Sequence, residues 1–170
     1  MSSSLHMDVP PPYISGLYVV EYALVDDSIV FEQRRTLNVD GEWLGRVPCL
    51  AICQDFDTLE YSIQHCATDW EPLGGARGYE SVEKVKERIE RSYHGIRAKW
   101  IRAETTFEEA RALYEAELRA DSCSFCGRTP FEMRRMVATE DHSARICDDC
   151  IDRYYKLIHD DDMPDNSFTN

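Results

Sequence analysis

The sequence predicts an α+β fold, in which an antiparallel sheet of about four strands carries two helices on one face and a small four-cysteine module follows. Residues 59–66 alternate with a period of two, which predicts a strand with one buried face. The apolar period becomes helical after residue 80, and two CxxC pairs, 123-CSFC-126 and 147-CDDC-150, lie near the C-terminal end. Because strands precede helices, both are expected in one domain. The residues expected on the buried face of the alternating strand are Leu59, Tyr61, Ile63 and His65.

The other strands are expected before the alternating segment. Residues 17–25 and 28–39 are rich in β-branched and aromatic side chains, and 26-DDS-28 between them suits a hairpin turn. A third strand is expected at residues 47–53, after the Asp-Gly reversal in 40-DGEW-43. With the alternating segment, these strands predict an antiparallel meander.

Two helices are expected after the sheet. The first begins at Ser81, a residue type that caps helix N-termini, and ends at His94-Gly95. The second opens with 106-TFEE-109, the pattern of a capping box, and residues 98–102 between them are expected to form an edge strand. The side chains expected to face inward are Val82, Val85, Ile89 and Tyr93 in the first helix, and Phe107, Ala110, Leu113, Tyr114 and Leu118 in the second.

Composition divides the 170 residues into four predicted parts. Residues 1–12, rich in Ser and Pro, predict a disordered leader; 13–120 form the α+β domain, 121–159 the four-cysteine finger, and 160–170 a solvated acidic tail. The 19 Lys and Arg against 32 Asp and Glu give a net charge of −13. Such a surface repels nucleic acid and anionic lipid and favours basic partners.

Nothing in the sequence predicts export or a membrane span. No apolar run approaches the roughly 20 residues that cross a bilayer, and MSSSLHMDVPPP lacks the basic start and apolar core of a signal peptide. The seven cysteines are an odd number, four of them in CxxC pairs, which favours metal thiolates in a reducing cytoplasm over a disulfide framework.

The two CxxC pairs predict a zinc site. Each CxxC turn presents two sulfurs to one ion, and the twenty residues between the pairs let the second pair complete a tetrahedron. Gly127 permits the tight turn after the first pair, and residues 151–158 carry apolar side chains at helical spacing, as in a treble-clef-like finger. With four thiolate ligands no position remains for an activating water, so one structural Zn(II) per chain is expected. The predicted ligands are Cys123, Cys126, Cys147 and Cys150, whereas His142, in the polar stretch 139–145, is not expected to be one.

The segment 122-SCSFCGRTPFEMRRMVATEDHSARICDDCIDRYYKLI-158 resembles the four-cysteine zinc-binding domain of ClpX, the unfoldase of the ClpXP protease. The likeness lies in CSFCG, in the run ending at 134-RRMV-137, in the Ile before the second pair, and in CDDC followed by an amphipathic helix. In that family the domain dimerises and docks substrates and adaptor proteins, so the resemblance implies an interaction module. The finger comes first in ClpX and an ATPase follows, whereas this chain has the finger last and no GxxxxGK[ST] loop. The part before it, including 41-GEWLGRVPCLAIC-53, resembles small bacterial proteins that carry this finger at their end.

Four other residues, Cys49, Cys53, His65 and Cys66, suggest a second metal site or a Cys/His dyad. Their spacing matches no zinc knuckle, and free cysteine is among the most commonly buried residue types, so core packing is favoured. The run 74-GGARG-78 lacks the GxGxxG spacing of a phosphate loop, and a plain connecting loop over residues 71–79 is favoured.

Two kinds of surface contact are also considered. Arg128, Arg134 and Arg135 suggest a small basic spot for nucleic acid, but acidic residues beside the second pair oppose it. Tryptophans at interfaces are often hot spots; among Trp43, Trp70 and Trp100, Trp70 is the preferred anchor, although burial is favoured for each.

These observations predict a non-enzymatic protein-interaction protein, because no constellation of nucleophile, base and pocket is visible. The leading hypothesis is an acidic immunity protein or antitoxin that inhibits a basic toxin, since complementary charge speeds association. The alternatives are an adaptor or regulator of a Clp-type unfoldase, with a homodimer formed through the finger as a further possibility, and a nucleic-acid-binding regulator.

Overall fold

The structure is a computed structural model, and it describes residues 8–34, 38–39 and 41–159. The chain divides into two compact units, Met1–Tyr114 and Glu115–Asn170. The predicted tail and residues 1–7 of the predicted leader lie outside the described residues. Within the described part, no helix combines the length and the apolar character that a membrane crossing needs.

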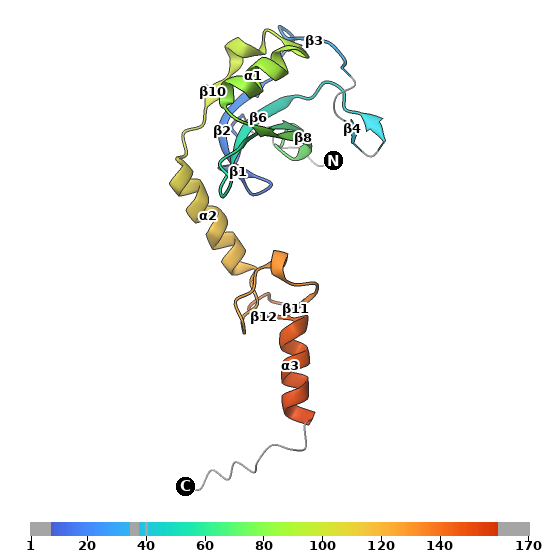
Figure 1. The fold of residues 1–170 in the computed structure, drawn as a ribbon, viewed down its shortest axis with the longest axis vertical. Coiled ribbons are helices and arrows are strands. Elements are labelled where there is room, and N and C mark those ends of the chain that lie inside the picture. The colour runs from blue at the N-terminus through green and yellow to red at the C-terminus, as the bar shows by residue number, and fades with distance from the viewer. Residues whose placement is uncertain (1–7, 35–37, 40, 160–170) are drawn as a thin grey trace. The chain divides into compact units, whose positions relative to one another are not determined.

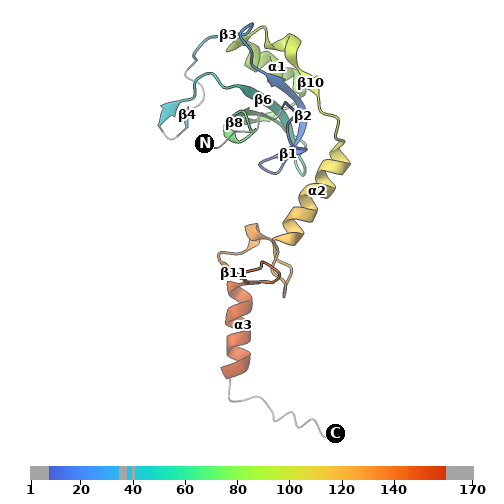
Figure 2. The same ribbon diagram turned by 180° about the vertical axis from the view of Figure 1, so that it is seen from behind.

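A curled antiparallel sheet forms the centre of the first unit (Figures 1 and 2). Its strands run in the order β1-β2-β6-β7-β8, and β10 pairs with β2 on the β1 side. Six strands therefore replace the four expected. They are β1 (Tyr13–Ile14), β2 (Leu17–Leu24), β6 (Cys49–Asp55), β7 (Tyr61–Cys66), β8 (Pro72–Tyr79) and β10 (Ile101–Arg102).

Short ladders and helices complete the described chain. In the first unit β3 (Val30–Phe31) pairs with β9 (Tyr93–His94), and β4 (Asn38–Val39) with β5 (Glu42–Trp43). The helices are α1 (Val82–Glu90), the 3-10 turn η1 (Ile96–Lys99) and α2 (Phe107–Ala120), within which the two units divide. The second unit continues with η2 (Pro130–Glu132), β11 (Met136–Ala138), β12 (Arg145–Cys147) and α3 (Asp148–His159).

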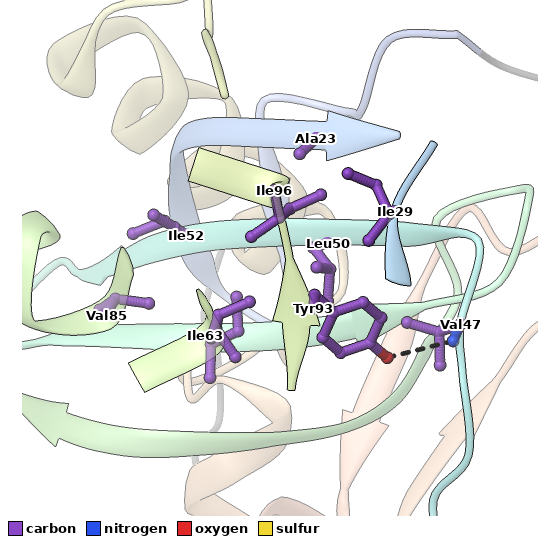
Figure 3. Close-up of a cluster of buried hydrophobic side chains, with 10 residues drawn as sticks. Ala23, Ile29, Val47, Leu50, Ile52, Ile63, Val85, Tyr93 and Ile96 are labelled. Atoms are coloured by element: carbon purple, nitrogen blue, oxygen red, sulfur yellow. Dashed lines mark hydrogen bonds between the residues drawn. The ribbon is translucent and has the colours of Figure 1, made fainter. Parts of the chain in front are cut away.

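One face of the sheet packs against α1. Val85 and Ile89 of the helix join the buried side chains of β2, β6 and β7 in one apolar cluster. Tyr93 closes this cluster, and its hydroxyl accepts a hydrogen bond from the backbone N–H of Val47 at 3.2 Å (Figure 3). The other members of the cluster are Ala23, Ile29, Val47, Leu50, Ile52, Ile63 and Ile96.

The opposite face is buried as well. Strand β7 was expected to have one buried face, but Ser62 and Gln64, on its polar side, are both buried. The curl of the sheet encloses this side around a second apolar cluster. Its members are Ile14, Leu17, Val19, Tyr22, Cys49, Ala51, Cys53, Cys66 and Trp70.

The predicted helix starts are confirmed. The Ser81 hydroxyl accepts a hydrogen bond from the Lys84 N–H at 3.3 Å. Thr106 and Glu109 form the expected capping box, because the Glu109 carboxylate accepts from the Thr106 N–H at 2.9 Å and the Thr106 hydroxyl accepts from the Glu109 N–H at 3.2 Å. One inward residue was wrongly expected, since Leu113 of α2 is 52 % exposed. Tyr93 is buried as expected, but it lies on β9, beyond the end of α1.

Two other local predictions are wrong. Residues 26–29 do form a turn, with the Ile29 N–H bonded to the Asp26 carbonyl at 3.0 Å, but β2 pairs with β6 and the next segment pairs with β9. The expected long strand over residues 28–39 is therefore interrupted at residues 32–34, and the described residues of the segment form two short ladders. The expected loop at residues 71–79 is strand β8, paired along its length with β7.

Candidate metal centre

The four predicted cysteines converge in the second unit. Their sulfurs all lie within 4.8 Å of one another, and within the described residues they form the one group of side chains that can hold a metal. Two Sγ–Sγ distances are 3.9 Å, for Cys123 and Cys150, and 3.6 Å, for Cys126 and Cys147. A tetrahedron with Zn–S bonds of about 2.3 Å has edges of about 3.8 Å, so the sulfurs fit one Zn(II).

Backbone geometry builds the first pair into a knuckle. The Gly127 N–H bonds to the Cys123 carbonyl at 2.8 Å, and Gly127 has a φ of 74°, a left-handed conformation that glycine adopts without strain. The Cys123 N–H in turn bonds to the Arg128 carbonyl at 2.9 Å. The second pair spans the end of β12 and the first turn of α3, which places Cys147 opposite Met136 of β11.

Buried sulfur and amide donors set the protonation of this site. Burial raises the pKa of Cys123, but the backbone N–H groups of Cys126, Cys147 and Phe125 bond to its sulfur and bring the pKa down to about 6. Burial raises the pKa of Cys150 to about 12. A bound Zn(II) would hold all four sulfurs as thiolates, so zinc uptake releases protons.

The zinc site stabilises a segment with very little other core. Among the described residues, three of the cysteines form its buried cluster, and Met133 and Ile146 are the hydrophobic side chains packed against them. A segment with so few buried apolar side chains depends on a metal for its fold.

The other cysteines do not join a site. Cys49, Cys53 and Cys66 lie in the apolar cluster on the curled side of the sheet, whereas His65 lies on the opposite face against Tyr93. Burial raises the pKa of Cys49 to about 11 and that of Cys66 to about 12, and it also raises the pKa of Cys53. These thiols are protonated core residues at neutral pH, as the sequence favoured.

The predicted surface contacts have mixed outcomes. Trp70, the preferred interface anchor, is 2 % exposed and packs edge-on against Tyr22 with ring centroids 5.6 Å apart. Trp43 is 46 % exposed. In the basic spot, Arg128 forms an ion pair with Asp149, and Arg134 with Asp148 at 3.6 Å, so acidic partners neutralise two of the three arginines.

The exposed apolar residues of the second unit were not singled out from the sequence as an interaction surface. Apolar side chains at helical spacing along residues 151–158 predicted a helix, and the apolar stripe of such a helix normally packs onto a core. In the structure, Tyr155 and Ile158 of α3 are 62 % and 76 % exposed. The helical spacing of these apolar residues can be read from the sequence. Only the fold shows that the described part of the second unit leaves the stripe uncovered.

Comparison with known proteins gives one match. Residues 121–160 match the family described as ClpX C4-type zinc finger. Neither the curated proteins nor the solved structures give a match to the chain. The C-terminal segment of this chain is therefore similar to the four-cysteine zinc finger of ClpX, and its cysteines are placed to hold one zinc ion.

Proposed function

We propose that this chain is a non-enzymatic, zinc-binding protein-interaction protein, and that its zinc segment contacts a protein partner through apolar side chains that the segment leaves exposed. The observation that carries the proposal is the α3 stripe, defined as Ile151, Tyr154, Tyr155 and Ile158. These residues are 38 % to 76 % exposed, although their spacing of three and four residues puts them on one side of the helix.

The stripe continues onto the finger. The ring of Phe125, itself 58 % exposed, packs against Tyr154 with centroids 5.4 Å apart. Phe125 and Val137 also line a shallow groove of about 280 Å³ along β11 and β12. Single exposed apolar residues are common, but a continuous set of aromatic and aliphatic side chains is typical of a protein-binding surface.

The partner is expected to bring its own apolar surface. A second copy of this chain satisfies that condition, since an amphipathic helix is self-complementary about a twofold axis, and a homodimer is the simplest form of the proposal. An adaptor role toward a Clp-type unfoldase uses the same surface and follows from the similarity to the ClpX finger.

A toxin-inhibiting role makes a different demand on the partner. The net charge of −13 favours a basic partner, and this is the support for an immunity protein or antitoxin. Association driven by charge weakens steeply with salt, whereas association through the α3 stripe does not. The salt dependence of binding separates the two, and nucleic-acid binding, which the charge opposes, would also be salt-sensitive.

The test uses the tagged, zinc-loaded full chain and makes two measurements on each variant. The first identifies the proteins that copurify with it from its native cell, and the second determines its oligomeric state by sedimentation. Ile158→Glu places a charge in the stripe and is expected to abolish association, whether with a second copy or with another protein. Arg153→Glu introduces the same residue on the other side of α3 and is the matched control. If both variants associate like the unmodified chain while binding one zinc each, the stripe is not the interaction surface.

A further inference from the structure

The end of α2 depends on a hydrogen-bond donor from outside the helix. The last carbonyl groups of an α-helix have no partner within it, and Ala120 is the last residue of α2. If the helix continued, the Ala120 carbonyl would accept from the Ser124 N–H. That N–H bonds to the Arg145 carbonyl instead, at 2.8 Å, so the Ala120 carbonyl needs another donor.

The side chain of Arg145 supplies this donor from the zinc finger. Its Nη1 donates to the Ala120 carbonyl at 2.6 Å, and its Nη2 lies 3.0 Å from the Asp121 carboxylate. Nη1 also lies 3.3 Å from the His142 carbonyl. The side chain is 20 % exposed, and a cation at this end of a helix interacts favourably with the helix dipole. Arg145 therefore caps α2.

The backbone of Arg145 is held by both cysteine pairs. Arg145 begins β12, the strand that ends at Cys147. Its N–H bonds to the Ser124 hydroxyl at 2.9 Å, and its carbonyl accepts from the Ser124 N–H. Ser124 lies between Cys123 and Cys126 of the first pair. The position of Arg145 thus requires that the two pairs lie together.

A bound Zn(II) is what keeps the two pairs together, because this segment has little other core. Loss of the metal is therefore expected to remove Arg145 from the end of α2. The other side-chain bond at this end is local, since the Ser122 hydroxyl donates to the Leu118 carbonyl at 2.7 Å, and it does not require the finger. The Arg145 cap is the contact that depends on the metal.

We propose that Arg145 couples the metal state of the finger to the C-terminal turn of α2. With zinc bound, Arg145 holds this turn closed, and zinc loss releases it. Such a coupling is reciprocal, so the cap also strengthens zinc binding. The inference goes beyond the proposed function, because it concerns a conformational change within the chain and does not depend on the α3 stripe.

The experiment measures amide hydrogen exchange by nuclear magnetic resonance on the full chain, with zinc and after removal of zinc by a chelator. The amides of residues 117–121 report the C-terminal turn, and their exchange is expected to become at least about tenfold faster without zinc. The Ala110 N–H, which bonds to the Thr106 carbonyl at 3.0 Å in the first unit, is the internal reference and is expected to keep its rate.

Arg145→Gln separates the cap from the fold of the finger. In the zinc-loaded chain this variant is expected to exchange about three- to tenfold faster at residues 117–121, the range for a lost cation at a helix end. Its zinc affinity, measured by competition with a chromogenic chelator, is expected to fall by the same factor. In the zinc-free chain the variant and the unmodified protein are expected to exchange alike, which is the signature of coupling.

The matched control is Arg128→Gln, which removes the same charge from the finger. The Arg128 guanidinium pairs with Asp149 of α3 and not with α2, so exchange at residues 117–121 is expected to stay within about twofold of the unmodified rate. Equal acceleration by the two variants would mean that charge alone, and not the Arg145 cap, sets the stability of the turn.

Two further results would overturn the proposal. Unchanged exchange in zinc-loaded Arg145→Gln means that Arg145 does not hold the turn. Equal acceleration by this variant with and without zinc means that the cap is independent of the metal. If Arg145→Gln does not bind one zinc per chain, Asp121→Asn decides, because it keeps Arg145 and removes its ion pair. Faster exchange only in the zinc-loaded state is then expected, and equal exchange in both states contradicts the coupling.

Discussion

Buried ionisable side chains in the first unit lie in uncharged forms at neutral pH. Burial lowers the pKa of His65 to about 4 and raises that of Cys49 to about 11, because the low-dielectric interior disfavours the charged form of each group. Burial also raises the pKa of Tyr93. The core of this unit is therefore neutral near pH 7, and acid is the condition that disturbs it.

His65 makes the first unit less stable as the pH falls from about 6.5 to 4. In this window the unfolded chain binds a proton that the folded chain excludes, so the free energy of unfolding decreases with decreasing pH. With a folded pKa of about 4 and an ordinary value of about 6.5, the loss between pH 7 and pH 5 is about 2 kcal/mol. The measurement is urea unfolding by tryptophan fluorescence in phosphate-free buffer.

The matched control is His65→Gln, which keeps a polar side chain but cannot titrate. This variant is expected to have a flatter dependence on pH across the same window. If it loses as much stability as the unmodified chain, groups other than His65 account for the acid sensitivity.

Individual residues differ in how far the sequence predicts them. Cys123 and Cys126 are three positions apart, so their shared role follows from local spacing. A pocket of about 70 Å³ in the first unit is lined by Arg34, His65 and Arg88, which come from separate elements. That arrangement is set by the curl of the sheet and the position of α1, and no local pattern encodes it.

Among the elements, β8 shows how backbone pairing can replace side-chain propensity. The strand includes Gly74, Gly75 and Gly78, residues that weaken strand formation, and the sequence predicted a connecting loop here. Pairing with β7 brings its backbone into close contact with the neighbouring strand. A Cβ on Gly75 would lie 2.6 Å from the Ile63 carbonyl oxygen, so glycine is required there by close approach.

Gly75→Ala is expected to destabilise the first unit by about 1–3 kcal/mol, the usual cost of a forced clash in a packed region. The clash is with the Ile63 backbone, which cannot move without disturbing β7. Chemical denaturation measures the loss. Gly45→Ala is the control, since the nearest atom to its added methyl is the Gln33 Oε1 at 4.0 Å; an equal loss there would mean that the backbone contact is not the cause.

At residues 28–39 the sequence predicted more strand than the described residues form, whereas at β8 it predicted a loop where a strand forms. The β-branched and aromatic residues of 28–39 predicted a long strand, but among the described residues of this segment only Val30–Phe31 and Asn38–Val39 pair, and with different partners. Propensity indicates where a strand can form, whereas the available edge decides whether it does. Helix caps were predicted more reliably because their hydrogen bonds are local to Ser81 and Thr106.

At the scale of the whole molecule, the two units have different sources of stability. The first has three clusters of buried apolar side chains, whereas the described part of the second relies on the cysteines with Met133 and Ile146. The metal therefore stabilises one unit and is not needed by the other.

Removal of zinc by a chelator is expected to unfold the second unit and leave the first intact. Helical circular dichroism should fall as α3 is lost. Tryptophan fluorescence should not change, because Trp43, Trp70 and Trp100 all belong to the first unit. A concurrent change in both signals would show that the first unit also depends on the metal.

The separation of the seven cysteines between these units gives the chain a natural set of thiol reporters. Four form the metal site, and three are enclosed on the curled side of the sheet. Alkylating reagents attack the thiolate and require access, so metal loss exposes four reactive sulfurs and opening of the sheet exposes the remaining three. The number of alkyl groups on each intact chain, read from its mass, therefore reports which unit has opened without any introduced label.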